Sequence, residues 1–352
     1  MNGKSIINNM NVLLTSAGRR SYIVDYFKKV NGIGKVYASN SAYTIALKRA
    51  DGYYISPLIY NPEYIPSIIK FCKEHEIKVV LSLFDIDLLV LAQNADAFKE
   101  NGIELVLAPA DFVKICNDKY ATYQFVCSLG LKSPKTYLTT DSVKEAIANG
   151  EISYPVIMKP RWGMASMGIY KVEDDEELEF FTRKCKKDIF NSYLKYESSM
   201  TKDEPIIYQE VMTGEEYGLD VLNDLNGNYI KTFAKQKVTM RSGETDLGRT
   251  ADPTPFEKTA QAISAKSGHH GICSVDCFKK DGEIYVIEMN CRISGHYPLA
   301  YLAGFNYPQL VIDWMYGKET NPELIKFETD LYIIKDLLPT ILSKGKNGRT
   351  LA

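Results

Sequence analysis

A short apolar stretch in the last quarter of the chain carries three polar side chains at alternate positions. It reads Tyr-Val-Ile-Glu-Met-Asn-Cys-Arg and contains Glu288, Asn290 and Arg292. Because side chains alternate across a β-strand, these three should point to one face. A carboxylate and an amide oxygen suit a hard cation such as Mg²⁺, and an arginine beside them suits a phosphate or carboxylate held by that cation. The spacing therefore predicts a face that handles a nucleoside triphosphate.

A further acidic side chain, Asp276, lies on the preceding predicted strand, residues 272–278. A two-residue Asp281-Gly282 turn would place Asp276 and Glu288 on opposite faces, whereas an odd-length loop would place them on one face. We predict the odd loop, with Gly282 at a positive φ. The side chains of Asp276, Glu288 and Asn290 would then supply oxygen ligands for one or two Mg²⁺ ions. Mn²⁺ is an alternative to Mg²⁺ at this site.

A lysine and a glycine-containing loop follow the apolar run 155–158. Lys159 ends this run, and a lysine at a strand end is most often only a solvated terminus. Here the loop Gly163–Gly168 follows, and free backbone N–H groups in such a loop can surround phosphate oxygens. The loop lacks the Gly-Lys-Ser/Thr of a Walker A motif, so by itself it is a weak indication of a phosphate site.

Two further segments carry candidate ligands. The strand 206–212 could link two lobes and offer its backbone and Glu210 to an adenine edge, with Glu216 on the ribose, although a strand with a solvated turn is the simpler interpretation. Charges on a strand edge commonly serve solubility. Four cations lie in the segment 232–250, namely Lys235, Lys237, Arg241 and Arg249. Because this segment precedes the predicted metal-binding strands, we favour a role for the four cations in contacting a triphosphate and an anionic substrate.

Seven cysteines are scattered along the chain. His269, His270, Cys273 and Cys277 resemble zinc ligands, but their spacing fits no common finger pattern. Strand alternation also turns Cys273 and Cys277 away from Asp276. We favour packed, reduced thiols, as expected of a cytoplasmic protein, and no flanking motif supports a Cys–His nucleophile.

The bulk composition argues against two classes of partner. Lys and Arg number 42 against 44 Asp and Glu, giving a net charge of −2, so the basic excess typical of nucleic-acid binding is missing. No apolar run approaches membrane-spanning length. The N-terminal region also lacks the features of a signal peptide. We expect residues 1–10 to be a disordered leader before a start near Met10.

The predicted elements explain how these residues could meet. Residues 11–115 alternate strand-like and helix-like segments, which is typical of a doubly wound parallel sheet with ligands beyond the carboxyl ends of its strands. We expect strands at 12–15, 36–39, 78–82 and 105–108, and helices at 22–30, 64–75 and 88–101. A small α+β module should follow, with helices at 118–129 and 174–192 and a strand at 154–159. Further strands are expected at 206–211, 217–222, 229–238 and 272–278 before the metal-binding strand, and a helix at 308–316 after it.

Taken in order, these pieces resemble the ATP-grasp superfamily over residues 11–320, nearest to its carbamoyl-phosphate-synthetase-like branch but with a single grasp unit. The motifs that carry the likeness are Asp118-Lys119, Val156–Pro160, Gly163–Gly168, Gln209-Glu210, Glu216-Tyr217 and Val286–Arg292. The resemblance implies an α/β fold, α+β in its later parts. A Rossmann-like parallel sheet at 1–115 would precede a two-lobed ATP-grasp fold, with a small lobe at 116–208 and a large lobe at 209–352.

The resemblance also implies roles for individual residues. The phosphates of ATP would contact Lys119, Lys159, Gly163, Ser166 and Gly168. The adenine would contact Gln209, Glu210, Val211 and Met212, and the ribose Glu216. Mg²⁺ would bind Asp276, Glu288 and Asn290. Residues acting on the reacting groups would be Arg292, Arg241 and Lys237. The chain departs from the family at Cys291, where Pro is usual, and at Asp276, where Glu or Gln is frequent.

The implied activity is ATP-dependent ligation of a small-molecule carboxylate to an amine through an acyl phosphate. The proton of the amine could pass to a substrate oxygen, to Asp85 or Asp87, or to water. The residues that determine substrate specificity should lie at the domain junction. The candidates at this junction are residues 16–20, Asp85, Asp87, Arg249, His296 and Tyr297. A homodimer is compatible with the sequence.

Two other functions remain as alternatives. An NAD(P)-dependent oxidoreductase would use the first sheet, but Thr-Ser-Ala-Gly-Arg-Arg at 15–20 does not match G-x-G-x-x-G. A non-catalytic nucleotide-binding protein would not need the combination of Lys159, Glu288, Asn290 and Arg292.

Overall fold

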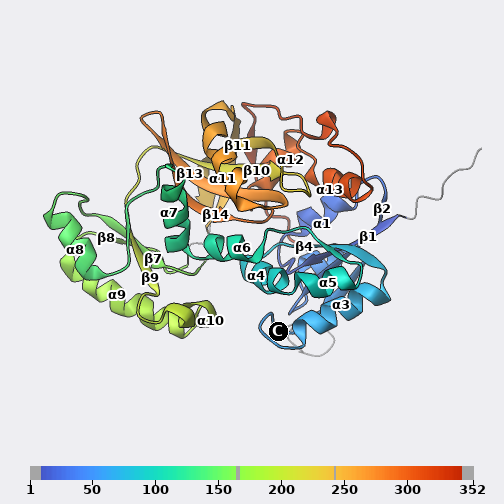
Figure 1. Ribbon diagram of the computed structural model, residues 1–352, viewed down its shortest axis with the longest axis horizontal. Coiled ribbons are helices and arrows are strands. Elements are labelled where there is room, and N and C mark those ends of the chain that lie inside the picture. The colour runs from blue at the N-terminus through green and yellow to red at the C-terminus, as the bar shows by residue number, and fades with distance from the viewer. Residues whose placement is uncertain (1–8, 164–166, 242, 343–352) are drawn as a thin grey trace, which may run out of the picture.

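Three β-sheets organise the chain in the computed structural model, which describes residues 9–163, 167–241 and 243–342 (Figure 1). Ser166 lies outside these ranges. None of the helices within them combines the length and the apolar character needed to cross a membrane.

The first sheet is parallel and five-stranded, in the order β3-β2-β1-β4-β5. Its strands are β1 (Met10–Thr15), β2 (Ile33–Asn40), β3 (Gly52–Ile55), β4 (Ile77–Ser82) and β5 (Glu104–Leu105). The connecting helices are α1 (Ser21–Phe27), α2 (Ile45–Arg49), α3 (Tyr64–Glu74), α4 (Asp85–Gln93) and α5 (Ala95–Glu100). Parallel neighbours need such crossovers, and the buried strands read as continuous apolar runs. The predicted parallel sheet is confirmed.

Three details of this sheet differ from the expectation. The strand β3 and the helix α2 were not predicted. The single helix expected over 88–101 is two helices that meet at Asn94, whose side chain donates to Val90 O. Finally, β5 has two residues instead of four.

The second sheet is small and has the order β6-β9-β7-β8. It comprises β6 (Thr136–Tyr137), β7 (Val156–Pro160), β8 (Tyr170–Val172) and β9 (Ile206–Glu210), with α8 (Thr140–Ala148), α9 (Asp175–Phe190) and α10 (Lys195–Ser198) around it. Its core is separate from the other cores and includes Val156, Met158, Leu178 and Tyr208. Figure 1 shows this lobe at one end of the molecule. The domain boundaries at 115 and 208 stay predictions, and the second falls within β9.

The third sheet is antiparallel and six-stranded, in the order β14-β13-β10-β11-β12-β15. Its strands are β10 (Glu215–Asn223), β11 (Tyr229–Arg241), β12 (Glu244–Ala251), β13 (Gly271–Lys280), β14 (Glu283–Asn290) and β15 (Tyr332–Ile334). The helices that precede or pack against this sheet are α6 (Ala110–Asn117), α7 (Lys119–Ser128), α11 (Glu257–Ser267), α12 (Tyr297–Leu302) and α13 (Tyr307–Met315).

The β13–β14 hairpin corrects one prediction. The loop is the two-residue Asp281-Gly282 turn, since Lys280 pairs with Glu283. Both loop residues have positive φ, 51° and 81°, as a type I′ turn requires, so the positive φ of Gly282 is confirmed and the odd loop is wrong. A β-bulge nevertheless places Asp276 opposite Glu288, because Cys277 pairs with Val286 whereas Asp276 pairs with Glu288. The extra residue is Ile287, and a bulge of this kind re-aims the side chains that follow it.

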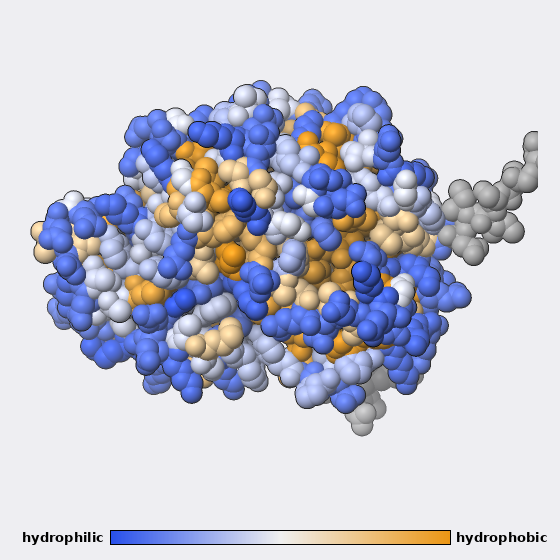
Figure 2. Space-filling view, viewed as in Figure 1, coloured by the Kyte–Doolittle hydropathy of each residue, from blue (hydrophilic) through white to orange (hydrophobic). Residues whose placement is uncertain are grey.

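The first and third sheets share a hydrophobic core. Leu14 of β1 and Phe233 of β11 belong to one buried cluster together with Leu310 of α13. The rings of Tyr26 and Tyr301 stack between α1 and α12 with centroids 3.7 Å apart. Figure 2 shows apolar side chains over the middle of the visible face, with polar surface around them. The first and third sheets therefore pack as one body, whereas the small lobe has its own core.

Candidate active site

The three predicted metal ligands lie together at the end of the β13–β14 hairpin. Asp276 and Glu288 are direct cross-strand partners, and Ser274 pairs with Asn290. Asn290 Nδ2 donates to Glu288 Oε1 over 3.2 Å. Two carboxylates and one amide oxygen thus come from adjacent strands, which is a donor set suited to Mg²⁺.

One cation, Lys237, holds one of the two carboxylate oxygens of Asp276. Its Oδ2 lies 3.0 Å from Lys237 Nζ. Its Oδ1 is buried 3.6 Å from His296 Nε2 and accepts no hydrogen bond from the described residues. Burial would raise the pKa of Asp276, but Lys237 and the His296 ring lower it below the usual value. The carboxylate is therefore ionised and keeps one oxygen available for a cation.

Lys237 joins the acidic hairpin to β10. Its Nζ is 2.8 Å from Glu216 Oε1 as well as 3.0 Å from Asp276 Oδ2. Burial favours a lower pKa, yet the Asp276 and Glu216 carboxylates raise the pKa of Lys237 above its ordinary value. Glu216 is thus paired with a lysine, and its predicted contact with a ribose stays a prediction.

Two buried lysines face this acidic group from the other side. Lys159 is the penultimate residue of β7 and donates to Gln209 Oε1 over 2.9 Å. Burial, and next the charge of Lys119, lower the pKa of Lys159 to about 8, although Glu288 and Asp276 oppose the shift. Lys119 donates to Gly163 O. Two buried ammonium groups that form no ion pair with a carboxylate of the described residues make a site that an anion would stabilise.

Asp118 fixes the first turn of α7, on which Lys119 lies. Its carboxylate accepts from the backbone N–H groups of Tyr120 and Ala121, as an N-cap does. It also forms a two-pronged ion pair with Arg161, with contacts of 2.8 and 2.7 Å. The sequence suggested Asp118-Lys119 as a motif but gave no role to Arg161, which ties the loop after β7 to α7.

The predicted adenine contacts lie on and after β9. Gln209 is buried and bridges Lys159 and Thr136, to whose Oγ1 it donates over 2.9 Å. Glu210 N donates to Lys135 O over 2.9 Å. Val211 and Met212 follow the strand and are partly exposed. These positions lie at the end of β9 and directly after it, and their contact with adenine stays a prediction.

The glycine loop is described at its two ends. Gly163 accepts from Lys119, and Gly168 has a φ of 67°. A Cβ added at Gly168 would lie 3.1 Å from Pro160 Cγ, so both the backbone angle and the close approach favour glycine there.

Arg292 is joined to the first sheet's helices. Its Nη2 lies 2.7 Å from Asp85 Oδ2, at the start of α4. Burial would lower the pKa of Arg292, but Asp85 raises it. Arg20 lies nearby and donates to the carbonyl groups of Leu83 and Ile293 over 2.9 Å each. The carboxyl end of the first sheet thus meets the segment that follows β14, as its topology predicts.

Three of the four predicted cations on β11 and β12 have other partners. Lys235 is fully buried in an ion pair with Asp220. Arg241 pairs with Asp246 and donates to Lys335 O, and Arg249 pairs with Asp330. Alternation along β11 turns Lys235 and Lys237 to one face, but only Lys237 reaches Asp276. The prediction that all four hold anionic ligands is therefore wrong for Lys235, and the described contacts of Arg241 and Arg249 do not support it.

Two junction candidates are structural residues. Asp87 is fully buried and accepts hydrogen bonds from four hydroxyl groups, those of Thr15, Ser16, Tyr64 and Ser82. Tyr297 is buried, donates to Phe305 O and accepts from Tyr307 N. Neither side chain is free to meet a substrate, so the suggested roles of Asp87 in proton transfer and of Tyr297 in specificity are wrong.

Glu197 is a site residue that the sequence did not indicate. It lines a cavity together with Asp85, Lys119, Glu288 and Asn290. It is buried, and its Oε1 accepts no hydrogen bond from the described part of the chain. Burial, followed by the charge of Asp85, raises the pKa of Glu197 to about 7. A glutamate in the charged segment 195–204 looks solvated in the sequence, and only the tertiary structure buries it.

Comparison with known proteins shows the family of this chain. The chain matches the model of the ATP-grasp domain over residues 116–296, and that of the PylC-like N-terminal domain over residues 12–106. The first match covers more than half of the chain, which therefore belongs to the ATP-grasp family, as the ordered motifs predicted.

Individual relatives are distant. The chain is 24% identical to the carbamoyl phosphate synthase arginine-specific large chain of Bacillus subtilis (strain 168) over 251 residues, which are 69% of this chain and 23% of that one. It is 26% identical over 209 residues to the D-alanine–D-alanine ligase of Fusobacterium nucleatum subsp. nucleatum, 56% of this chain and 65% of that one. The crystal structure of L-amino acid ligase from Bacillus licheniformis matches with a TM-score of 0.68 at 21% identity, covering 91% of this chain and 79% of that one. The chain thus spans about a quarter or less of the length of the carbamoyl phosphate synthase relatives.

Proposed function

We propose that this protein is an ATP-dependent ligase that joins a small-molecule carboxylate to an amine through an acyl phosphate and releases ADP and phosphate. One observation carries the proposal. Two buried lysines, Lys119 of α7 and Lys159 of the small lobe, lie opposite the oxygen donors Asp276 and Glu288. Phosphoryl transfer needs positioning and charge cancellation more than covalent help, and this arrangement supplies both.

The oxygen donors fit a magnesium ion. Asp276 Oδ1 is buried, ionised and without a hydrogen-bond donor among the described residues, and a cation would satisfy it. Asp276, Glu288 and Asn290 would hold the metal, one ion or two, with Mg²⁺ favoured over Mn²⁺. The ion would neutralise negative charge on the β- and γ-phosphates of ATP.

The protein's own groups would position both steps. In the first step, a substrate carboxylate oxygen forms a bond to the γ-phosphorus while the bond to the β-phosphate oxygen breaks and ADP leaves. Arg292 would orient that carboxylate, and Lys119 and Lys159 would stabilise the phosphates. In the second step, the amine nitrogen bonds to the acyl carbon and the carbon–oxygen bond to phosphate breaks.

Glu197 is the residue best placed to accept the proton of the amine. It faces the same cavity as Asp85 and Glu288, and a pKa of about 7 lets it exist as a carboxylate at neutral pH and still bind a proton. Asp85 is less suited to this step because Arg292 neutralises it.

The test is a measurement of ADP release with panels of amino acids and sugar acids as carboxylates, paired with amines. We expect ADP release that requires both substrates, together with an amide product detected by mass spectrometry. ADP release from ATP alone, or ATP binding without any turnover, would instead support a nucleotide-binding protein without ligase activity.

The oxidoreductase alternative finds little support in the first sheet. The loop after β1 packs against Asp87 through Ser16, and Arg20 spans from this loop to Leu83 and Ile293. A dinucleotide would have to displace these contacts. A thermal-shift comparison of NADH with ATP separates the two functions, and we expect stabilisation by ATP with Mg²⁺ only.

A further inference from the structure

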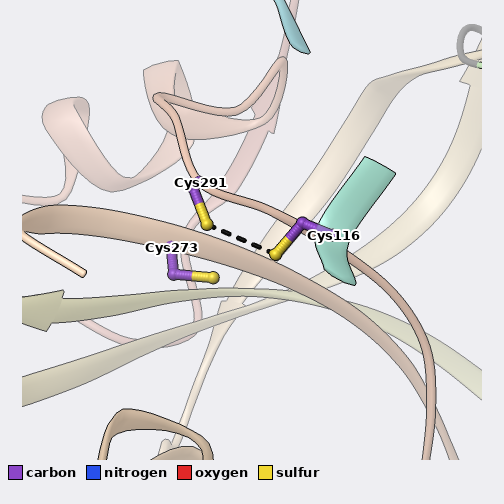
Figure 3. A group of neighbouring side chains, drawn as sticks. All are labelled: Cys116, Cys273 and Cys291. Atoms are coloured by element: carbon purple, nitrogen blue, oxygen red, sulfur yellow. Dashed lines mark hydrogen bonds between the residues drawn. The ribbon is translucent and has the colours of Figure 1, made fainter. Parts of the chain in front are cut away.

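Three cysteine thiols converge behind the proposed metal site. Cys116 lies in the last turn of α6, Cys273 lies on β13, and Cys291 follows β14 directly after Asn290 (Figure 3). The sulfur atoms of Cys116 and Cys291 are 3.3 Å apart, and all three sulfur atoms lie within 4.8 Å of one another. Figure 3 shows the three side chains turned toward a common space from three separate segments.

The thiols are set apart from water but not from the active site. All three belong to a buried hydrophobic cluster that includes Phe112, Val126 and Met289, none of which brings a charge to the group. Cys116 also lines the cavity that contains Lys119 and Asn290. Of the three thiols, only that of Cys116 lines this cavity, and a fixed charge among the buried thiols would be costly.

The donor set defines the kind of element that would bind. Sulfur ligands select soft elements over Mg²⁺, and structural zinc sites take four ligands. Within the described residues no carboxylate or imidazole joins the three sulfur atoms. With metal–sulfur bonds of about 2.3 Å, a three-coordinate centre keeps its sulfur atoms about 3.5–4 Å apart. The observed spacing is close to that requirement.

We propose that Cys116, Cys273 and Cys291 form a binding site for a trivalent thiophilic element, arsenic or antimony, separate from the Mg²⁺ site. Binding of arsenous acid balances without oxidation or net charge. Three arsenic–oxygen bonds break and three arsenic–sulfur bonds form, and each thiol proton leaves with a hydroxyl group as water. The neutral product suits the apolar surroundings better than the anionic complexes that copper(I) or zinc would give with three thiolates.

Arsenic bound to the three cysteines would affect the neighbouring active site by fixing the position of the segments that carry its residues. Bound arsenic would fasten the end of α6, two residues before Asp118 and three before Lys119, to the segment between Asn290 and Arg292. We expect it to slow the release of ADP. This consequence, unlike binding itself, rests on the proposed ligase function.

The test uses the full-length reduced protein and sodium arsenite as the probe. We expect one arsenic per chain to remain after desalting, X-ray absorption to show three sulfur neighbours, and arsenite to protect Cys116, Cys273 and Cys291 from alkylation. Cys273→Ala should reduce arsenic affinity at least tenfold. The matched control is Cys277→Ala, because Cys277 is also buried on β13 but lies outside the triad, and it should bind arsenic as the unmodified chain does.

Three results would overturn the site. They are unchanged affinity in Cys273→Ala, protection that instead maps to the exposed Cys127, or failure of the fully reduced protein to bind arsenite. Tighter binding of zinc chloride than of arsenite would reject the assignment of a trivalent element. If Cys273→Ala fails to fold, the cysteines that arsenite protects from alkylation in the unmodified chain show whether the three-cysteine site exists. Arsenic binding without any slowing of ADP release would leave the site standing and contradict only its link to activity.

Discussion

Asp85 and Arg292 are 207 residues apart in the sequence, yet Asp85 Oδ2 lies 2.7 Å from Arg292 Nη2. The aspartate begins α4 of the first sheet's unit, and the arginine follows β14. Both side chains are about nine-tenths buried. A substrate carboxylate that binds Arg292 would have to share this guanidinium with Asp85, so the first sheet's unit takes part in the proposed chemistry.

Removing the Asp85 charge should therefore affect both stability and turnover. We expect Asp85→Asn to leave Arg292 buried without a counter-ion and to lower the free energy of unfolding by about 3 kcal/mol, since breaking one side of a buried pair is strongly destabilising. Urea unfolding measures this loss. Asp85→Asn combined with Arg292→Gln should recover part of it, and strictly additive losses would contradict a direct pairing.

Glu288 should be essential for turnover but not for folding. Glu288→Gln keeps the shape of the side chain and removes the charge that would hold Mg²⁺, so we expect ADP release to fall at least a hundredfold with an unchanged circular dichroism spectrum. Glu283→Gln is the control, because Glu283 begins the same strand and is exposed. Comparable rates in the two variants would remove Glu288 from the metal role.

Lys159 should contribute mainly to ATP affinity. Its ammonium is buried and hydrogen-bonded only to the neutral Gln209 among the described side chains. We expect Lys159→Met to weaken ATP binding at least tenfold in isothermal titration calorimetry. Lys171→Met, at an exposed position of the neighbouring β8, should bind ATP normally. Equal affinities would mean that the phosphates bind elsewhere.

The pH dependence of turnover should report on Glu197. A general base must be deprotonated, so kcat should rise with pH and level off above about 7, the pKa of Glu197. In Glu197→Gln the rate should be lower and this rise should disappear, while the KM for ATP stays nearly constant. An unchanged pH profile in the variant would assign the proton transfer to another group.

Local patterns in the sequence predicted most of the elements around the site. The alternation of Glu288, Asn290 and Arg292 indicated the strand, and the parallel first sheet followed from its alternating segments. The short α2 and β3 were missed, because Ile45–Arg49 is too short to show helical periodicity and Gly52–Ile55 is half exposed.

The tertiary contacts of the site were harder to predict. The two-residue turn at Asp281-Gly282 was considered and set aside, because a bulge at Ile287 leaves no clear mark in the sequence. The burial of Glu197 and the Asp118–Arg161 pair depend on how the small lobe folds. For the same reason the partners of Lys235 and Arg241 were not predictable, since each is an acidic residue elsewhere in the third sheet.

The shared core of Leu14, Phe233 and Leu310 has a consequence for unfolding. Neither the first nor the third sheet can lose its structure without exposing apolar surface of the other, whereas the small lobe keeps Val156 and Tyr208 in a core of its own. Calorimetry should therefore record two cooperative transitions instead of three. Limited proteolysis should cut first at the connections of the lobe that carries Lys159, and it should leave the two larger sheets associated even where the chain between them is nicked.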